Sequence, residues 1–472
     1  MTNKVGGLVA SLLVLAAATA GPASAEPSSA RTDPGSVRES VAYLVRTYGV
    51  DQQEALRRLE LQRDAGELDR WLRRVAPDLY GGMWIDQKAG GTLVVTFTDP
   101  SAARQHIAGR PGAAAAQVRT VKYSLAALSS ASERIGEQVG AGPESVYLPA
   151  VSTTENRVVV WERAWLKKNK TTASTEAAPE SRVFDADSAK VTTRVLQKPT
   201  PYAADPVDKG YCHPLFCTDH GPMRGGLRLD MTRDNGTVGG CTSGFNLRTT
   251  GGAFPNVPWV LTAGHCMATK TNNVPTQHNT QPVLNQHGIE KNAYPYDYAA
   301  VQYVDAPTAG KWLESQSARN LVLRQCGESA CDPASPSANQ EITKVTPLTE
   351  VIPGSVVCAS GSGSNAVTYP EAVDSGAGEG YLVGTKCGQV LSTDVGINTD
   401  VCARAGDSGG PLFSQVDKAA LGILEGSQQS RSGPCQPGEL NNYAPLSTVL
   451  EDLSARQASG GSVFTVITTP QG

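Results

Sequence analysis

The chain has 472 residues, enough for roughly two or three domains with their own cores. Its 41 basic and 45 acidic residues leave a net charge of −4, with no strong run of either sign. Because nucleic-acid binding requires a basic face, this balance argues against a nucleic-acid partner.

The first 25 residues have the three parts of a secretory signal peptide. Met1 to Lys4 form a short basic start, an apolar run extends from Val5 to Ala20, and Ala23-Ser24-Ala25 is a small-residue cleavage site. The alternative is a membrane anchor, but the run is shorter than the ~20 apolar residues that cross a bilayer. We therefore expect cleavage after Ala25 and an exported protein without a membrane partner.

The cysteines divide the rest of the chain into two halves. All ten lie between Cys212 and Cys435. An even number confined to one half of an exported chain indicates a domain cross-linked by disulfides. The cysteine-free half before it is then a separate unit, as a removable pro-region would be.

Residues 36 to 161 are predicted to alternate helices and hairpins. Ser36 with Glu39, and Asp51 with Glu54, have the spacing of capping boxes, and apolar residues at helical intervals follow each pair. Further elements are expected as a hairpin at 83–97, a helix at 101–108, a strand at 118–123, a helix at 126–139 and a second hairpin at 146–161. A hairpin with a helix thus occurs twice, which is an α+β pattern.

Residues 167 to 208 are polar and rich in Thr, Ser, Ala and Pro, which predicts a linker with one strand near 191–196. Proteolysis concentrates in exposed linkers of this kind, so we expect maturation between about 180 and 226. The cleaved bond is left open.

The half that begins near residue 209 is rich in glycine. Short runs of Val, Ile, Leu and Tyr are broken by Gly, Pro and Asn, and no long helical period occurs before 447–455. This composition predicts an all-β body with a C-terminal helix.

Within this half, Ser408 lies in Gly406-Asp407-Ser408-Gly409-Gly410, a pattern of a tight turn. The amides of Gly406 and Ser408 can converge on one concavity, and two N–H donors beside a hydroxyl form an oxyanion hole beside a nucleophile. The same Gly-x-Ser-x-Gly pattern also describes the nucleophile elbow of lipases and esterases.

The order of the motifs separates these possibilities. The six histidines are His106, His213, His220, His265, His278 and His287. None follows Ser408, which excludes the Ser…Asp…His order of lipases. Residues 261–266 (Leu-Thr-Ala-Gly-His-Cys) and 296–301 (Tyr-Asp-Tyr-Ala-Ala-Val) precede it instead and supply the order His265…Asp297…Ser408. The fallback carboxylates are Asp305, Asp332 and Asp374.

These three motifs in this order resemble the trypsin/chymotrypsin-like serine peptidases, specifically the secreted bacterial branch of the streptogrisins and alpha-lytic protease. The resemblance implies two six-stranded antiparallel β-barrels, with His265 and Asp297 on the first, Ser408 on the second, and the active site between them. Ser408 is then the nucleophile, His265 the general base and acid, and Asp297 the group that orients the imidazole. No cofactor or metal is implied.

The segment Tyr80 to Asp86, with Leu93 to Val95, resembles the pro-region of the same peptidases. In that family the pro-region templates folding of the catalytic domain and inhibits it until it is degraded. The alternative is an accessory binding domain that the mature protein retains.

The resemblance also implies disulfides. They are Cys241–Cys266 at the histidine loop, Cys358–Cys387 in the second barrel and Cys402–Cys435 at the serine loop. Cys212–Cys217 and Cys326–Cys331 form two short Cys-x4-Cys loops, for which local bridges are expected and cross-pairing stays open. With His213 and His220, a zinc site at the first loop is the alternative, which the exported context disfavours.

Three positions depart from the family pattern. Ala359 replaces an arginine that neutralises the aspartate before the nucleophile, so Asp407 needs another cation, either Arg404 or a new N-terminus. Glu425 stands where a serine usually supports the catalytic aspartate, and could instead face the pocket. Asp400 precedes the Cys402 bridge, where trypsins carry a pocket aspartate. The predicted pocket residues are Asp400, Ala403, Leu424, Glu425 and Gly426.

The prediction is a secreted, monomeric serine endopeptidase made as a zymogen, which acts on proteins or peptides and has its own pro-region as a partner in cis. Its parts are a signal peptide at 1–25, an α+β pro-region at 26–166, a linker at 167–208 and a mainly β peptidase domain at 209–472. The alternative is a non-catalytic binding protein on the same fold. A subtilisin-like order with Asp230 or Asp234 fails, because that fold needs alternating strands and helices.

Overall fold

The computed structural model describes residues 32–140, 145–166, 188–201, 206–207, 222–236, 238–252, 255–267, 271–313, 320–324, 338–363, 384–429, 431–457 and 460–468. The predicted signal peptide lies outside these residues. Among the described helices, none combines the length and the apolar character needed to cross a membrane.

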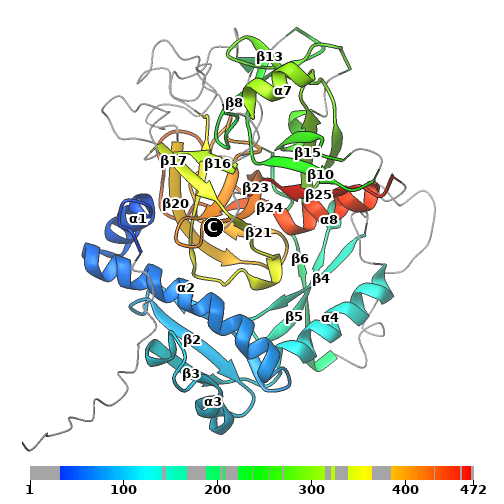
Figure 1. The fold of residues 1–472 in the computed structure, drawn as a ribbon. Coiled ribbons are helices and arrows are strands. Elements are labelled where there is room, and N and C mark those ends of the chain that lie inside the picture. The colour runs from blue at the N-terminus through cyan, green and yellow to red at the C-terminus, as the bar shows by residue number, and fades with distance from the viewer. Residues whose placement is uncertain are drawn as a thin grey trace, which may run out of the picture. The chain divides into compact units, whose positions relative to one another are not determined.

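The N-terminal half contains two similar α+β units (Figure 1). The helices are α1 (Arg38–Tyr48), α2 (Gln52–Val75), α3 (Pro100–Ile107) and α4 (Leu125–Val139). The strands are β1 (Tyr80–Asp86), β2 (Thr92–Phe97), β3 (Ala116–Thr120), β4 (Tyr147–Ser152), β5 (Arg157–Glu162) and β6 (Val191–Val195). Each sheet is a hairpin with a third strand added parallel to its second strand. The predicted hairpins and helices are therefore present, and β6, which was expected in the linker, completes the second sheet.

Apolar faces and caps explain these helices. Leu68 and Leu72 of α2 are buried in one core with Met83 and Val95 of the first sheet, and α4 covers the second sheet (Figure 1). Helix α2 begins after Asp51, whose side chain accepts a hydrogen bond from the Glu54 amide at 2.8 Å.

The predicted capping box at Ser36 and Glu39 is wrong. Val37 occupies the N-cap of α1 and makes no side-chain cap, while the Ser36 hydroxyl donates to the Asp33 carbonyl at 2.7 Å. Glu39 instead forms an ion pair with Arg324, 285 residues away and nearly buried. A buried guanidinium needs a carboxylate more than an exposed amide needs a cap, so the long-range pair takes the side chain.

The C-terminal half is mainly β, as predicted. Six strands form a closed antiparallel barrel, because β23 pairs with both β22 and β24. In spatial order they are β22 (Pro411–Ser414), β19 (Val356–Gly361), β20 (Gly384–Ser392), β21 (Ile397–Thr399), β24 (Asn441–Pro445) and β23 (Ala419–Ser427). A short strand, β18 (Lys344–Val345), adds to β23 in parallel, and α8 (Leu446–Arg456) is the predicted C-terminal helix.

Where a second six-stranded barrel was predicted, the described residues form a half-barrel, referred to below as the first barrel. It consists of two five-stranded sheets joined by a bridge between Leu284 and Tyr303. One contains β14 (Ile289–Ala293), β15 (Tyr296–Gln302), β11 (Pro258–Thr262), β10 (Asn246–Thr250) and β25 (Val463–Val466). The second contains β13 (Gln281–Leu284), β12 (Thr276–His278), β8 (Arg228–Thr232), β9 (Val238–Thr242) and β7 (Pro206–Val207). Helix α7 (Ala306–Trp312) and a hairpin of β16 (Asn320–Leu323) and β17 (Asn339–Ile342) connect the two barrels in sequence.

Phe245 and Leu261 from the first barrel are buried in one core with Ile423 from the second. This shared core brings the end of β11 and the start of β22 together. The three motifs singled out in the sequence therefore meet at the junction of the barrels.

Candidate active site

His265 lies on a short 3-10 turn, Gly264–Cys266, directly after β11. The disulfide between Cys266 and Cys241 ties this turn to β9. Asp297 is the second residue of β15, which pairs antiparallel with β11 from Trp259 to Thr262. Because the two strands are neighbours, their ends bring the imidazole and the carboxylate together.

Both oxygens of Asp297 are engaged by His265. Oδ1 accepts a hydrogen bond from the His265 backbone N–H at 2.7 Å, and Oδ2 is paired with Nδ1 of the ring. The side chains are only 9 and 6% exposed. This geometry fixes the orientation of the imidazole and directs Nε2 away from the carboxylate.

Nε2 faces the nucleophile candidate. It lies 2.9 Å from Ser408 Oγ, on the turn that precedes β22. Gly409 holds this turn against the first barrel at a φ of 83°, and a Cβ there would lie 2.2 Å from Thr262 Oγ1. Asp297, His265 and Ser408 thus form one hydrogen-bonded series across the two barrels.

The amides predicted to form the oxyanion hole belong to the same turn. The Gly406 carbonyl accepts from the Thr242 hydroxyl at 2.6 Å, and the Ser408 carbonyl accepts from the Thr242 amide at 2.8 Å. Within the described residues, the N–H groups of Gly406 and Ser408 donate no hydrogen bond. Both amides therefore lack an acceptor among the described residues, as an oxyanion hole requires.

Two protein-family models match separate parts of the chain. The model described as "Trypsin" matches residues 234–450, and the model described as "Alpha-lytic protease pro N-terminal" matches residues 53–119. Together the two matches support a serine peptidase domain of the streptogrisin and alpha-lytic protease type, preceded by a pro-region.

Two relatives come from Streptomyces griseus. Streptogrisin-D is 28% identical over 211 residues, which cover 44% of this chain and 43% of that protein. Streptogrisin-A is 27% identical over 229 residues, which cover 46% of this chain and 58% of that protein. The chain thus spans about half the length of the curated relatives it matches. Among solved structures, Thermobifida fusca Protease A matches with 18% identity and a TM-score of 0.29, covering 52% of this chain and 100% of that one.

The aspartate before the nucleophile, which this type of peptidase keeps beside a cation, is buried here as well. Asp407 accepts hydrogen bonds from the amides of Gly363 at 2.8 Å and Arg404 at 3.0 Å. The guanidinium of Arg404 turns away and forms a buried ion pair with Glu439 at 2.8 Å. Arg404 therefore contacts Asp407 through its backbone amide, while its guanidinium pairs with Glu439.

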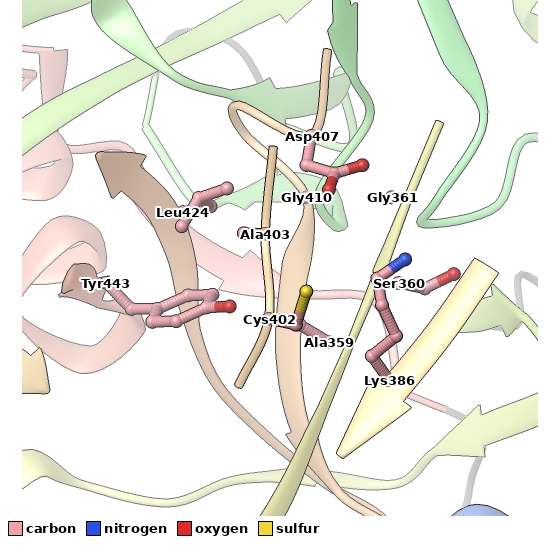
Figure 2. Close-up of a pocket in the computed structure, with 10 residues that line it drawn as sticks. All are labelled: Ala359, Ser360, Gly361, Lys386, Cys402, Ala403, Asp407, Gly410, Leu424 and Tyr443. Carbon is pink, nitrogen blue, oxygen red and sulfur yellow. The ribbon is translucent and has the colours of Figure 1, made fainter. Parts of the chain in front are cut away.

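Lys386 is a second cation close to Asp407. It pairs across β19 and β20 with Ala359, the position where an arginine was expected. Lys386 and Asp407 line the same small cavity. Figure 2 shows the Lys386 side chain with its amine at the end nearer to Asp407. Burial lowers the pKa of Lys386 to about 8, although the Asp407 carboxylate acts to raise it. The sequence could not reveal this cation, since it depends on the strand register that places Lys386 opposite Ala359, 27 residues earlier in the chain.

The predicted pocket residues separate into two groups. Ala403 and Leu424 line the cavity of Figure 2, together with Cys402 and Tyr443. Asp400 does not line it: its carboxylate accepts from the Gln389 amide at 2.6 Å and from the Tyr43 hydroxyl of α1 at 3.2 Å. The Asp400 carboxylate thus contacts α1 and does not line this cavity.

Glu425 and Gly426 lie on β23 beyond this cavity. Glu425 Oε1 accepts a hydrogen bond from the Asp297 amide at 3.1 Å, so the side chain is directed towards the carboxylate of the series and not into the pocket. Gly426 lies against the chain segment at Thr200: a Cβ on Gly426 would lie 2.5 Å from the Thr200 carbonyl oxygen.

Three of the predicted disulfides are formed, Cys241–Cys266, Cys358–Cys387 and Cys402–Cys435. The last joins the start of the serine turn to the segment that follows β23. Cys212, Cys217, Cys326 and Cys331 lie outside the described residues, as do His213 and His220. Cys241, Cys266 and His265 lie close enough to hold a metal ion, but the two sulfurs are bonded to each other and offer no thiolate.

Proposed function

We propose that this chain is the zymogen of a secreted, monomeric serine endopeptidase. The observation that carries the proposal is the series from Asp297 through His265 to Ser408, with the imidazole 2.9 Å from the hydroxyl. A nucleophile needs a base within hydrogen-bond reach and the base needs an orienting group, and the series contains all three. The signal-peptide pattern at the N-terminus supports export.

In the proposed reaction, Ser408 Oγ bonds to the carbonyl carbon of a peptide while its proton passes to His265 Nε2. The amides of Gly406 and Ser408 hold the resulting oxyanion. The C–N bond then breaks as His265 returns the proton to the leaving amine, which leaves an acyl-enzyme. Water attacks this ester with His265 again as the base, and the acid product and Ser408 are released. The mechanism uses side chains, backbone amides and water.

The proposed substrate is an extended protein or peptide chain, and a segment of this chain itself supports that proposal. Thr200 forms an isolated antiparallel bridge with Ser427 at the end of β23. The Thr200 amide donates to the Ser427 carbonyl at 2.9 Å, and the Ser427 amide donates to the Thr200 carbonyl at 3.0 Å. An extended substrate would add to the same strand end, so we infer that the segment at Thr200 blocks substrate until the pro-region is cut away.

This inference predicts that a peptide of residues 194–201 with an amidated end inhibits the processed enzyme competitively. N-methylation of the Thr200 amide removes one donor and should weaken inhibition by about 3- to 10-fold, the value of one net hydrogen bond. The measurement is the inhibition constant against a small ester substrate. The matched control is Thr200→Val in the same peptide, which keeps the amide and should leave the inhibition constant nearly unchanged. Noncompetitive inhibition, or an N-methylated peptide that inhibits as strongly as the unmodified one, would contradict the inference.

The proposed function is tested by covalent labelling with diisopropyl fluorophosphate. We expect the processed protein to take up one label, on the peptide that contains Ser408, because only an activated serine reacts readily with this reagent. The full-length chain should be labelled more slowly, since the segment at Thr200 lies beside the site. A processed protein that folds but takes up no label would favour a non-catalytic binding protein on the same fold.

A further inference from the structure

Glu425 is a buried acidic side chain in direct contact with the proposed catalytic series. It lies on β23 with 3% of its surface exposed. Oε1 accepts a hydrogen bond from the Asp297 amide at 3.1 Å. Oε2 is equally buried and has no hydrogen-bond partner among the described residues. A carboxylate in this position would therefore bury one charged oxygen without a donor.

The neighbouring charges also favour an uncharged Glu425. Asp297, which acts on Glu425, is an acid with two partners of its own, the His265 backbone amide and the His265 ring. Two carboxylates that share a buried site cannot both ionise cheaply, and the one with fewer donors keeps the proton. Burial and the charge of Asp297 both raise the pKa of Glu425 well above its usual range.

The other titratable groups around Glu425 do not reverse this conclusion. Tyr294 and Tyr296, just before and at the start of β15, sense its charge, and burial raises the pKa of each phenol, so both stay neutral. Asp394, between β20 and β21, acts on Tyr294 as a further negative group. Arg163, which follows β5, is a nearby cation, and its guanidinium donates to the carbonyls of Tyr294 and Ser145.

We propose that Glu425 is a positioning residue for Asp297 that works as an uncharged carboxylic acid, and that its ionisation lowers activity. The inference rests on the proposed peptidase function. The carbonyl oxygen of the acid holds the Asp297 amide, and with it the carboxylate that orients His265. Where related peptidases have a serine hydroxyl that cannot titrate in this range, this chain has a group that can. The catalytic series therefore acquires a sensitivity to alkaline pH.

The test is the pH profile of kcat and kcat/KM of the processed enzyme on a small ester substrate. Above the pKa of Glu425, the wild type should lose about tenfold in kcat per pH unit, as for any single essential proton. Glu425→Gln keeps the shape and the carbonyl acceptor but cannot ionise. Its kcat should stay within about threefold of the wild type near neutrality, and the alkaline loss should disappear, with KM unchanged.

Two further variants distinguish other causes of an alkaline loss. Lys386 has a pKa of about 8 and also loses a charge in this range. Lys386→Arg keeps that charge, so a loss that disappears in this variant, and persists in Glu425→Gln, overturns the proposal. Glu341→Gln, which changes a half-buried carboxylate that pairs with Lys418, is the matched control and should retain the wild-type profile. A Glu425→Gln profile that superimposes on the wild type also overturns it.

A stability measurement tests the proposed protonation of Glu425 even if the protein has no peptidase activity. The folded chain keeps on Glu425 a proton that the unfolded chain releases, so wild-type stability falls as pH rises from the ordinary glutamate range to the raised folded pKa. In the full-length Ser408→Ala chain, Glu425→Gln should therefore gain in Tm relative to its parent as the pH rises above the ordinary glutamate range. A Tm difference independent of pH overturns the proposal, and Glu425→Ser replaces the glutamine if that variant does not fold. Absence of labelling at Ser408 in the wild type marks failure of the proposed function instead.

Discussion

Replacement of Ser408 or His265 by alanine is expected to lower kcat by about 10^6-fold, because the members of a catalytic triad act as a unit. The structure gives the reason for each residue. Ser408 Oγ is the only atom of the serine that reaches Nε2, and without the imidazole no other base lies within hydrogen-bond distance of this oxygen among the described residues. The measurement is single-turnover and steady-state hydrolysis of a peptide and of its ester by the purified processed proteins.

The double variant should be no slower than either single variant, since the second change removes a group that no longer acts. Ser392→Ala and His287→Ala are the matched controls: both residues lie outside the series, and His287 is an exposed partner of Glu290. The pro-regions of the wild type and of every variant are removed by the same added protease, so that processing does not depend on their own activity. Residual activity above about 1% of the wild type in either variant would contradict the assigned roles.

Asp297→Asn is expected to lower kcat by about 10^4-fold near neutral pH, the loss known for the equivalent change in a trypsin-like triad. Asp297 uses both oxygens as acceptors, one for the His265 amide and one for Nδ1. An asparagine offers one acceptor and one donor, so it stabilises the imidazole with a bare Nδ1 and a protonated Nε2. That tautomer cannot take the proton of Ser408.

The effect of Asp297→Asn is measured through kcat and through the rate of covalent labelling of Ser408, both as functions of pH. The comparison is Asp305→Asn, which changes the fallback carboxylate in the same way. Asp305 caps α7 by accepting from the Thr308 amide at 2.7 Å, a role that asparagine fills equally well, so this variant should keep wild-type kcat. If kcat fell strongly in Asp305→Asn and little in Asp297→Asn, Asp305 would be the residue that orients His265. That result would contradict the proposed series of Asp297, His265 and Ser408.

Local patterns in the sequence were sufficient to predict most helices and strands of both halves and the three residues of the proposed catalytic series. The helices and hairpins between residues 36 and 162 depend on periodicity, turn residues and the Asp51 cap, which act over a few residues. The order of His265, Asp297 and Ser408 excluded the lipase arrangement because it is a property of the linear chain. The all-β character of the second half followed from short apolar runs separated by glycine, whereas its barrel was implied by the family resemblance.

What surrounds the site was decided by tertiary structure. Lys386 lies opposite Ala359 only through the register of β19 and β20, and Arg404 turns to Glu439 because that carboxylate is buried beside it. Glu425 meets the Asp297 amide across 128 residues, and Glu39 leaves its helix terminus for Arg324 across 285. Buried charges pair with whatever partner the packing of distant strands brings within reach, and no short-range pattern encodes that choice.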